Sequence, residues 1–195
     1  DVSESRGLGD VYKRQNASCT TNCLAPVAFV IDKEFEIENG YMTTIHSFTG
    51  DQNTVDTFHK DLRRARAAST NIIPTSTGAA KAVGLVLPHL NGKLDGTAIR
   101  VPTPNVSLVD FKFNTKKNIT IENLNNKFQE YANSSLKGIL GVDTDPKVSS
   151  DYNHDARSSI LDLSETTTVS DNFGRVLTWY CLLYTSDAAD EIASV

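Results

Sequence analysis

Apolar residues recur at helical spacing in two segments of the chain. In the first segment, the apolar side chains lie three or four positions apart: Leu24, Val27, Ala28, Ile31 and Phe35. Pro26 lies early in this predicted helix, where its missing N–H costs least, and a helix that begins before Asn22 should kink there. The second segment follows Thr120, a good N-terminal cap, and its apolar stripe consists of Ile121, Leu124, Phe128 and Tyr131. Each segment therefore predicts a helix with one buried face.

Alternation of apolar and polar residues predicts strands elsewhere. One face of the predicted strand 41–48 carries Met42, Thr44, His46 and Phe48. Residues 109–114 alternate in the same way, and residues 170–180 are typical of a turn followed by a strand. A further helix is predicted to begin with Thr77 as its cap and to end at Pro88. Because the elements follow no regular βαβ order, we expect an α+β fold, with a mostly antiparallel or mixed sheet and helices on one face.

Composition narrows the class of protein. The chain has 195 residues, 39% of them hydrophobic and 22% charged, which is typical of one sizeable globular, soluble domain. Its net charge of -5 gives no general reason to bind nucleic acid or an anionic membrane. No apolar run reaches the roughly 18 residues of a membrane span, and no signal peptide is visible. Three cysteines are too few for a disulfide framework, so we expect a cytoplasmic protein.

The stretch NASCTTNCLAP, residues 16–26, raises the question of a nucleophile. Cys19 stands at a predicted helix start, where the helix dipole and unpaired N–H groups favour a thiolate. His46, at the end of a predicted strand, is a candidate base. The same pattern also fits small cysteines that pack against a helix start. Cys23 lies one turn further on, at a spacing unlike that of zinc or redox pairs, so we interpret it as a packing residue and expect no metal site.

A second signal concerns anions. Thr77 and Gly78 open a predicted helix, where backbone N–H groups readily bind phosphate. The long polar segment 50–75 is typical of a functional loop, and arginines whose forks suit phosphate lie in it and beyond it: Arg63, Arg64, Arg66 and Arg100. A solvated basic loop is the alternative interpretation. The stretch GLGDVY, residues 7–12, has Tyr12 at the third glycine position of a dinucleotide fingerprint and carries no weight.

Several motifs, taken in order, resemble the catalytic domain of phosphorylating glyceraldehyde-3-phosphate dehydrogenases. They are NASCTTNCLAP, TTIHSFTGDQ, RRARAASTNIIPTSTGAAKAVGLVLP, NGKLDGTAIRVPTPNVSLVDF, LKGILG and VLTWY, and the match runs from Asn16 to Tyr180. The resemblance implies that the Cys19 thiol attacks the aldehyde carbon and that His46 is the base. It further implies that hydride passes to NAD, and that inorganic phosphate then attacks the thioester to give 1,3-bisphosphoglycerate. The backbone N–H of Cys19 would help to hold the oxyanion.

The resemblance also assigns the anion sites. The residues matched to the attacking phosphate are Ser18, Thr20, Thr77 and Gly78. The residues matched to the phosphate of the substrate are Thr49, Arg64 and Arg100, with Arg66 as the alternative to Arg64. Asp51 would orient this loop. The loop 48–71 resembles a segment at the subunit interfaces of the family, which implies a homotetramer.

The resemblance stops on both sides of residues 16–180, which we expect to be a truncated catalytic domain. Residues 1–15 and 181–195 resemble nothing in the family, and we expect a non-native leader and tail. The NAD-binding Rossmann half has no counterpart here, so the cofactor-binding residues and the preference for NAD or NADP stay open, and this chain alone should be inactive. Two alternatives remain: an erythrose-4-phosphate dehydrogenase with the same cysteine and histidine, and an inert protein that keeps the fold.

Overall fold

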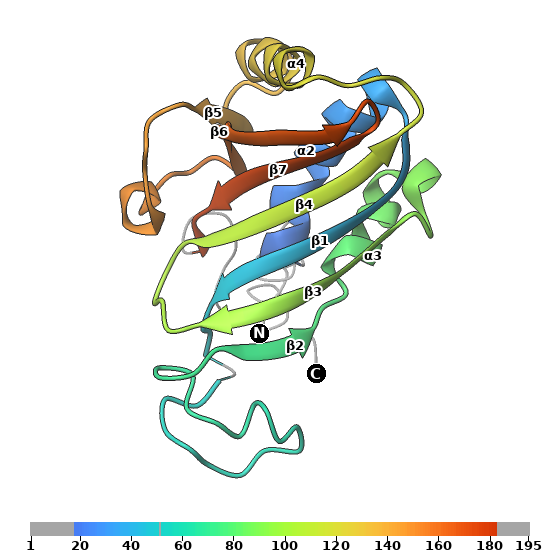
Figure 1. Cartoon of the computed structure of the whole chain (residues 1–195). Coiled ribbons are helices and arrows are strands. Elements are labelled where there is room, and N and C mark those ends of the chain that lie inside the picture. The colour runs from blue at the N-terminus through green and yellow to red at the C-terminus, as the bar shows by residue number, and fades with distance from the viewer. Residues whose placement is uncertain (1–17, 51, 183–195) are drawn as a thin grey trace, which may run out of the picture.

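A single seven-stranded sheet forms the centre of the protein. The computed structural model describes residues 18–50 and 52–182. The strands are β1 (Ile37–Ser47), β2 (Ile73–Ser76), β3 (Leu94–Val101), β4 (Ser107–Thr115), β5 (Leu140–Asp143), β6 (Ser159–Ser170) and β7 (Phe173–Tyr180). Their order in the sheet is β2-β3-β1-β4-β7-β6-β5 (Figure 1). Asp51, the predicted leader 1–15 and all of the predicted tail beyond residue 182 lie outside the described residues.

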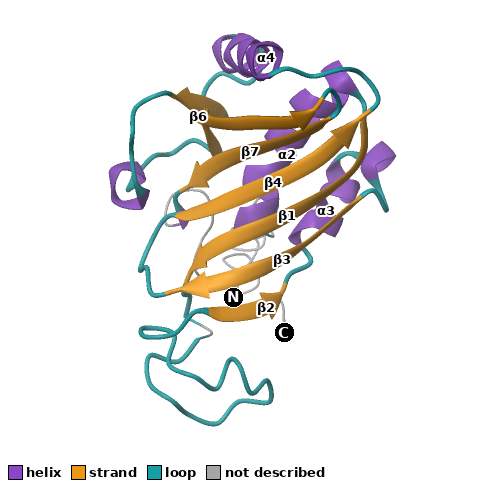
Figure 2. Ribbon diagram, viewed as in Figure 1, coloured by secondary structure: helices purple, strands orange, loops and turns teal. Residues whose placement is uncertain are grey.

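The sheet is mixed and mostly antiparallel. β1 pairs with β3, and β5 with β6, in parallel, while the other four neighbouring pairs are antiparallel. The helices are α2 (Cys19–Phe35), α3 (Ala79–Val86) and α4 (Ile121–Asn133), and short 3-10 turns cover Pro88–Leu90 and Ser149–Tyr152. Figures 1 and 2 show α2 and α3 behind the sheet and α4 along one end of it. The predicted α+β class with a mixed sheet is confirmed.

Helix α2 forms the middle of the buried layer. It contacts β1, β4, β6 and β7 as well as both other helices. Its apolar residues enter one continuous core with the inward side chains of β4, which are Val109, Phe111 and Phe113. These three phenylalanine and valine side chains are the apolar members of the predicted alternation, so that prediction is confirmed. Burial of this common face is what holds the helix over the strands that carry the site.

The two ends of α2 are fixed by local hydrogen bonds. The Ser18 hydroxyl accepts the N–H of Thr21 at 3.2 Å and caps the helix start. At the other end, Glu36 takes a left-handed conformation with φ 59 and donates its N–H to Asp32. The helix begins at Cys19, before Asn22, so Pro26 lies in its interior: the low-cost early position does not hold, and this is the case in which we expect a kink. The core contacts of α2 offset the backbone hydrogen bond that Pro26 cannot donate.

Other helices and strands also begin or end at residues different from those predicted. The strand expected over 41–48 begins four residues earlier, at Ile37, and ends before Phe48. The cap of α3 is Gly78, not Thr77, although the Thr77 hydroxyl still accepts the N–H of Ala79 at 3.2 Å. The same helix ends at Val86, so Pro88 opens the following 3-10 turn instead of ending α3. The Thr120 cap is confirmed, with a reciprocal hydrogen bond from Asn123.

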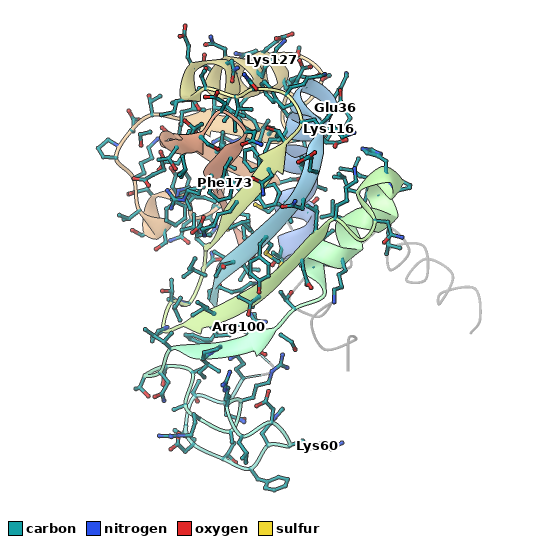
Figure 3. All side chains as sticks on the ribbon, turned by 45° about the vertical axis from the view of Figure 1, so that its right-hand side comes forward. Glu36, Lys60, Arg100, Lys116, Lys127 and Phe173 are labelled. Atoms are coloured by element: carbon teal, nitrogen blue, oxygen red, sulfur yellow. The ribbon has the colours of Figure 1, made fainter. Side chains whose placement is uncertain are left out.

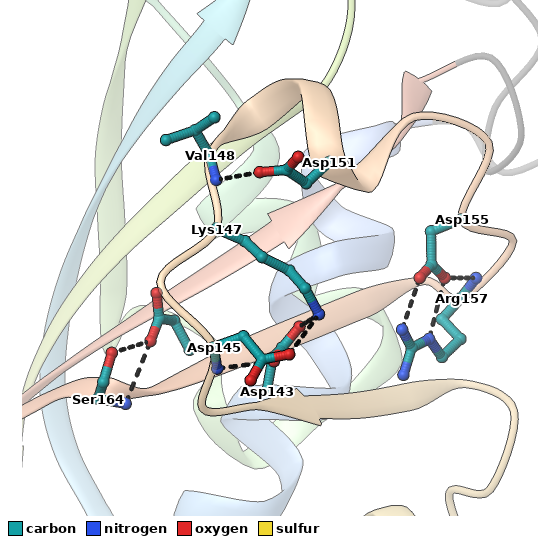
Figure 4. A network of polar contacts seen from close by, with 9 residues as sticks. Asp143, Asp145, Lys147, Val148, Asp151, Asp155, Arg157 and Ser164 are labelled. Atoms are coloured by element: carbon teal, nitrogen blue, oxygen red, sulfur yellow. Dashed lines mark hydrogen bonds and ion pairs between the residues drawn. The ribbon is translucent and has the colours of Figure 1, made fainter.

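A polar network fastens the connection between β5 and β6 (Figure 4). The Lys147 ammonium lies 2.5 Å from Asp143 and 3.2 Å from Asp145. Arg157 donates two side-chain hydrogen bonds and one backbone hydrogen bond to Asp155, which hold the pKa of that carboxyl below its usual value. Asp143, Asp145 and Asp155 are therefore paired with cations of the same segment, while Asp151 accepts the backbone N–H of Val148. None of the helices in the described ranges combines the length and apolarity that a membrane crossing requires.

Gly96 should be intolerant of any side chain. It is the register partner of Met42 in the parallel β1–β3 pair, and an added Cβ would lie 2.6 Å from the Met42 carbonyl oxygen. Gly96→Ala should therefore lower the free energy of unfolding by about 1–3 kcal/mol, measured by urea denaturation. The control is Gly50→Ala, because a Cβ on Gly50 would meet nothing within 4 Å. A Gly96→Ala protein as stable as its parent would contradict this packing.

Candidate active site

Cys19 and His46 meet where α2 begins and β1 ends. Cys19 is the first residue of α2, and His46 is the penultimate residue of β1 on its inward face. The Cys19 Sγ lies 3.4 Å from the His46 Nε2, and the two residues are only 5% and 2% exposed. The thiol thus sits at the positive end of a helix dipole and within hydrogen-bonding distance of an imidazole. The structure therefore brings together the predicted nucleophile and base.

The far nitrogen of the His46 ring faces two groups. Its Nδ1 lies 2.7 Å from the Ser47 carbonyl oxygen and 2.5 Å from the Arg100 Nη1. Arg100 also donates to the same carbonyl at 3.1 Å. A proton on Nδ1 donates to the Ser47 carbonyl, whereas a proton on Nε2 leaves Nδ1 to accept from Arg100. For His46 to act as the predicted base, the ring proton must lie on Nδ1. Nε2 then carries a lone pair that points at the Cys19 thiol and can accept its proton.

Strand register explains why Arg100 lies beside His46. In the parallel β1–β3 pair, His46 and Arg100 are direct partners and share the inward face. The same face of β2 carries Thr75, whose hydroxyl accepts hydrogen bonds from the Nε and Nη2 of Arg64 at 3.3 and 3.1 Å. Figure 3 shows Arg100 where the sheet meets the loop, and Lys60 at the distant tip of that loop. Two predicted anion-binding arginines therefore approach this end of the sheet.

The Arg66 side chain takes a different course. It is exposed and pairs with Asp56, with Nε and Oδ2 3.2 Å apart, within the loop itself. Arg64 instead reaches back to β2, so the geometry favours Arg64 over Arg66 as the inward arginine. Thr49 lies two residues after the end of β1, and its carbonyl accepts the N–H of Gln52 at 2.9 Å, which folds the chain back at the start of the loop.

The starts of α2 and α3 lie side by side. The Thr21 hydroxyl donates to the Ala79 carbonyl at 3.1 Å and links the first turns of the two helices. This contact brings Ser18 and the N-terminal N–H groups of α2 near Thr77 and Gly78, the two residues that precede α3. Two helix N-termini that converge in this way form a region suited to an anion. The four residues predicted for inorganic phosphate come from these two starts.

Of the four residues predicted to bind inorganic phosphate, Thr20 has a side chain that faces the core. It is only 4% exposed, and its hydroxyl lies 2.7 Å from the Tyr180 hydroxyl, inside the core. The side chain is thus committed to the interior, and an anion would meet Thr20 through its backbone N–H. The sequence shows that position 20 carries a hydroxyl. The direction of that hydroxyl depends on Tyr180 of β7, which lies 160 residues further along the chain.

Tyr180 is a site residue that sequence reasoning does not assign. Its hydroxyl also lies 3.0 Å from the Thr44 hydroxyl, and its ring packs edge-on against His46 at 6.0 Å between centroids. Burial raises the pKa of Tyr180 well above its usual value, with a further contribution from the nearby cysteines, so the phenol stays neutral. Tyr180 therefore joins α2, β1 and β7 behind the reacting pair. The only sequence signal is its place in the motif VLTWY.

Cys23 provides a contrast with Cys19. It is fully buried, and its thiol contacts the hydroxyls of Ser159 and Thr178 at 3.7 and 3.8 Å. Burial raises the pKa of the Cys23 thiol to about 12, although these hydroxyls partly oppose the shift. A thiol of this kind is protonated at neutral pH, which supports the interpretation of Cys23 as a packing residue.

Comparison with known proteins identifies the family to which the chain belongs. The family model for the C-terminal domain of glyceraldehyde 3-phosphate dehydrogenase matches residues 18–181. The chain belongs to this family. Cys19, His46 and the two helix starts therefore lie in the part of the chain that matches the glyceraldehyde-3-phosphate dehydrogenase catalytic domain. The predicted resemblance to the catalytic domain is confirmed.

Curated relatives agree with this assignment. The glyceraldehyde-3-phosphate dehydrogenases of Cereibacter sphaeroides and Xanthobacter flavus are 58% and 59% identical over 165 residues, or 85% of this chain and 50% and 49% of theirs. The chloroplastic glyceraldehyde-3-phosphate dehydrogenase B of Pisum sativum is 57% identical over 166 residues, covering 37% of its length. The chain spans about half the length of the bacterial relatives that it matches.

Proposed function

We propose that the protein acts in the phosphorylating oxidation of glyceraldehyde 3-phosphate to 1,3-bisphosphoglycerate, the glycolytic reaction, with Cys19 as nucleophile and His46 as base. The observation that carries this proposal is the 3.4 Å contact between the Cys19 Sγ and the His46 Nε2 at the start of a helix. A thiol in this position can lose its proton to the imidazole and is held as a thiolate by the helix dipole. The family assignment and the relatives support the same reaction.

The chain's own residues account for formation of the covalent adduct. As the Cys19 sulfur attacks the aldehyde carbon, a carbon–sulfur bond forms, and the thiol proton passes to the His46 Nε2. The carbonyl π electrons move to the aldehyde oxygen, which becomes the oxyanion of a thiohemiacetal. The backbone N–H of Cys19 belongs to the first turn of α2, where N–H groups have no acceptor within the helix, and it is suited to stabilise that charge.

The two anion sites divide between the helix starts and the arginines. We assign inorganic phosphate to the converging starts of α2 and α3, that is to Ser18, Thr20, Thr77 and Gly78. We assign the phosphate of the substrate to Thr49, Arg64 and Arg100. The contacts Thr21 to Ala79 and Arg64 to Thr75 support this division, because each holds its group at the same end of the sheet as Cys19.

NAD is the oxidant that this reaction requires, and when bound it supplies the hydride acceptor. Among the described residues there is no glycine-rich strand–turn–helix with paired glycines and a following acidic residue, the arrangement that holds a dinucleotide. Residues 18–50 and 52–182 therefore do not fit NAD by themselves, and we assign its binding to none of them. We expect this chain alone to show no appreciable NAD binding and no turnover.

We also propose a cytoplasmic homotetramer. The loop 48–71 exposes large apolar side chains, with Phe58 94% and Leu62 82% exposed, as expected of a segment that other subunits cover. The three cysteines are thiols that form no disulfide with one another, which suits a reducing compartment. Sedimentation analysis of the complete enzyme tests the tetramer.

Iodoacetamide labelling of the folded chain tests the activated thiol. At pH 7.5 we expect Cys19 to react at least about 100-fold faster than Cys23, because only about 1 in 3 × 10⁴ molecules carries a Cys23 thiolate when its pKa is about 12. Peptide mass spectrometry at timed intervals gives the three rates, with Cys181 as a second buried thiol. Urea-unfolded chain is the control and should label evenly. Even labelling of the folded chain would count against an activated Cys19.

A further inference from the structure

A buried serine lies directly behind the base. Ser107, the first residue of β4, accepts the backbone N–H of Ser47 with its Oγ at 3.0 Å. The hydroxyls of the two serines also lie 3.2 Å apart. Both residues are shielded from water, with exposed fractions of 1% and 0%. The His46–Ser47 peptide, to which this N–H belongs, is therefore fixed by a side chain from the neighbouring strand, and not only by the backbone ladder.

The next peptide, Ser47–Phe48, bears on which nitrogen of His46 carries the proton. Its carbonyl oxygen lies 2.7 Å from Nδ1 and requires a proton there. The Arg100 Nη1, 2.5 Å from the same nitrogen, favours the opposite tautomer, because a guanidinium can only donate. In that tautomer the proton sits on Nε2, and a neutral ring can no longer accept the proton of Cys19. The two neighbours of Nδ1 therefore compete over the function of Nε2.

We propose that Ser107 is a positioning residue that holds the Ser47 carbonyl against the His46 Nδ1, so that the carbonyl prevails over Arg100 and Nε2 stays free to act as base. The inference rests on the proposed roles of Cys19 and His46. Without the Ser107 oxygen, the buried Ser47 N–H loses its acceptor, and a rotation of the His46–Ser47 peptide to find another acceptor would turn the Ser47 Cα and the carbonyl attached to it. The carbonyl would then leave Nδ1, and Arg100 would hold the ring with its proton on Nε2.

Charged and titratable groups from three elements contact the His46 ring. Among these groups are Cys19 of α2, Arg100 of β3 and Tyr180 of β7. Ser107 contacts none of these three in the hydrogen bonds that define the site, so its removal changes no charge beside the ring. A change in the protonation of the His46 ring after Ser107→Ala would thus come from the backbone at Ser47 and from the tautomer, not from a lost charge.

The first test reads the tautomer directly. In a Cys19→Ser background, which removes the thiolate, ring-nitrogen NMR of His46 at pH 8 should show the neutral ring protonated on Nδ1. Adding Ser107→Ala should move at least about half of the population to the Nε2–H form, since the two tautomers of a free ring differ little in energy. A parent ring protonated on Nε2 would overturn the inference by itself, even if the Ser107→Ala protein failed to fold.

The second test follows Cys19 alkylation between pH 5 and 9. In the parent chain the reaction should already be fast near pH 6, and Ser107→Ala should raise the pH of half-maximal rate by about one unit, slowing alkylation at pH 6.5 roughly tenfold. The matched control is Ser159→Ala. It also removes one hydroxyl of a buried pair, here with Thr178, but it leaves the hydrogen bond from the Ser47 N–H to Ser107 in place. Ser159→Ala should keep the parent pH profile of alkylation and should lower the melting temperature about as much as Ser107→Ala does.

A pair of equal-sized variants separates chemistry from packing. Ser107→Thr keeps a hydroxyl acceptor and should retain the parent profile, whereas Ser107→Val has the same shape without the oxygen and should behave as Ser107→Ala. Equal profiles for the threonine and valine variants, or an unshifted Ser107→Ala profile beside a normal parent, would overturn the role of Ser107. A parent chain without fast alkylation near pH 6 would instead count against the proposed function.

Discussion

Replacing Cys19 by serine should reduce aldehyde oxidation by the complete enzyme at least about 10⁴-fold, the scale of loss seen when a nucleophile is removed. The Cys19 Sγ lies at the helix start and 3.4 Å from His46, an arrangement that stabilises a thiolate. A serine hydroxyl in the same place keeps the hydrogen bond but not the anion, because its proton is far less acidic. Substrate binding should survive, since the anion-binding side chains are unchanged.

Cys23→Ser is the matched control for this experiment. It makes the same change one helical turn further on, where the side chain faces the hydroxyls of Ser159 and Thr178 and can bond to them. Steady-state oxidation of glyceraldehyde 3-phosphate should stay within about threefold of the parent enzyme, because a tolerated buried substitution costs little stability. Retention of more than a few per cent of the activity by the Cys19→Ser enzyme would exclude Cys19 as the nucleophile.

His46→Asn should lower the rate of the same reaction by about 10²–10⁴-fold, the usual contribution of a general base. An amide has roughly the size of the ring but cannot take the Cys19 proton. The thiol should therefore ionise nearer its ordinary pKa of about 8.5, and alkylation of Cys19 should slow at pH 6–7 and recover as the pH rises. The signature is thus a loss that alkaline pH partly restores.

The control for the histidine is His89→Asn. The exposed His89 pairs with Asp32 near the opposite end of α2, far along the helix from Cys19. This contact lies far from the reacting pair, so loss of the His89 ring should leave both the rate and the pH profile as in the parent. If His46→Asn left the alkylation profile of Cys19 unchanged, the imidazole would have no part in ionising the thiol.

The sequence predicts best those elements whose two faces meet different surroundings. Residues 109–114 alternate because one face of β4 is buried and the other is not, and α4 shows a single stripe for the same reason. In β6, by contrast, Ser159–Leu163 are buried on both faces, so the period of two is absent and no strand is predicted there. β3 is missed because Asp95, Gly96 and Arg100 interrupt its apolar pattern.

The candidate site is predicted in its chemistry more than in its geometry. Strand periodicity puts His46 on the buried face, and the helix start singles out Cys19, so the reacting pair follows from local patterns. The direction of the Thr20 side chain and the place of Tyr180 depend on a contact that joins residues 160 positions apart. The protonation of His46 depends on a neighbouring strand. Such features follow only from the packed fold.

The position of β7 within the sheet has a consequence for how the protein reaches its active form. β7 lies between β4 and β6, so the strands on its two sides are joined in the sheet only through it. Long-range strand pairing is the slow step of folding in proteins of this type. During synthesis on the ribosome, the two parts of the sheet must therefore wait for residues 173–180 to emerge, and the groups around Cys19 should acquire their final arrangement last, in the same event that completes the β-structure.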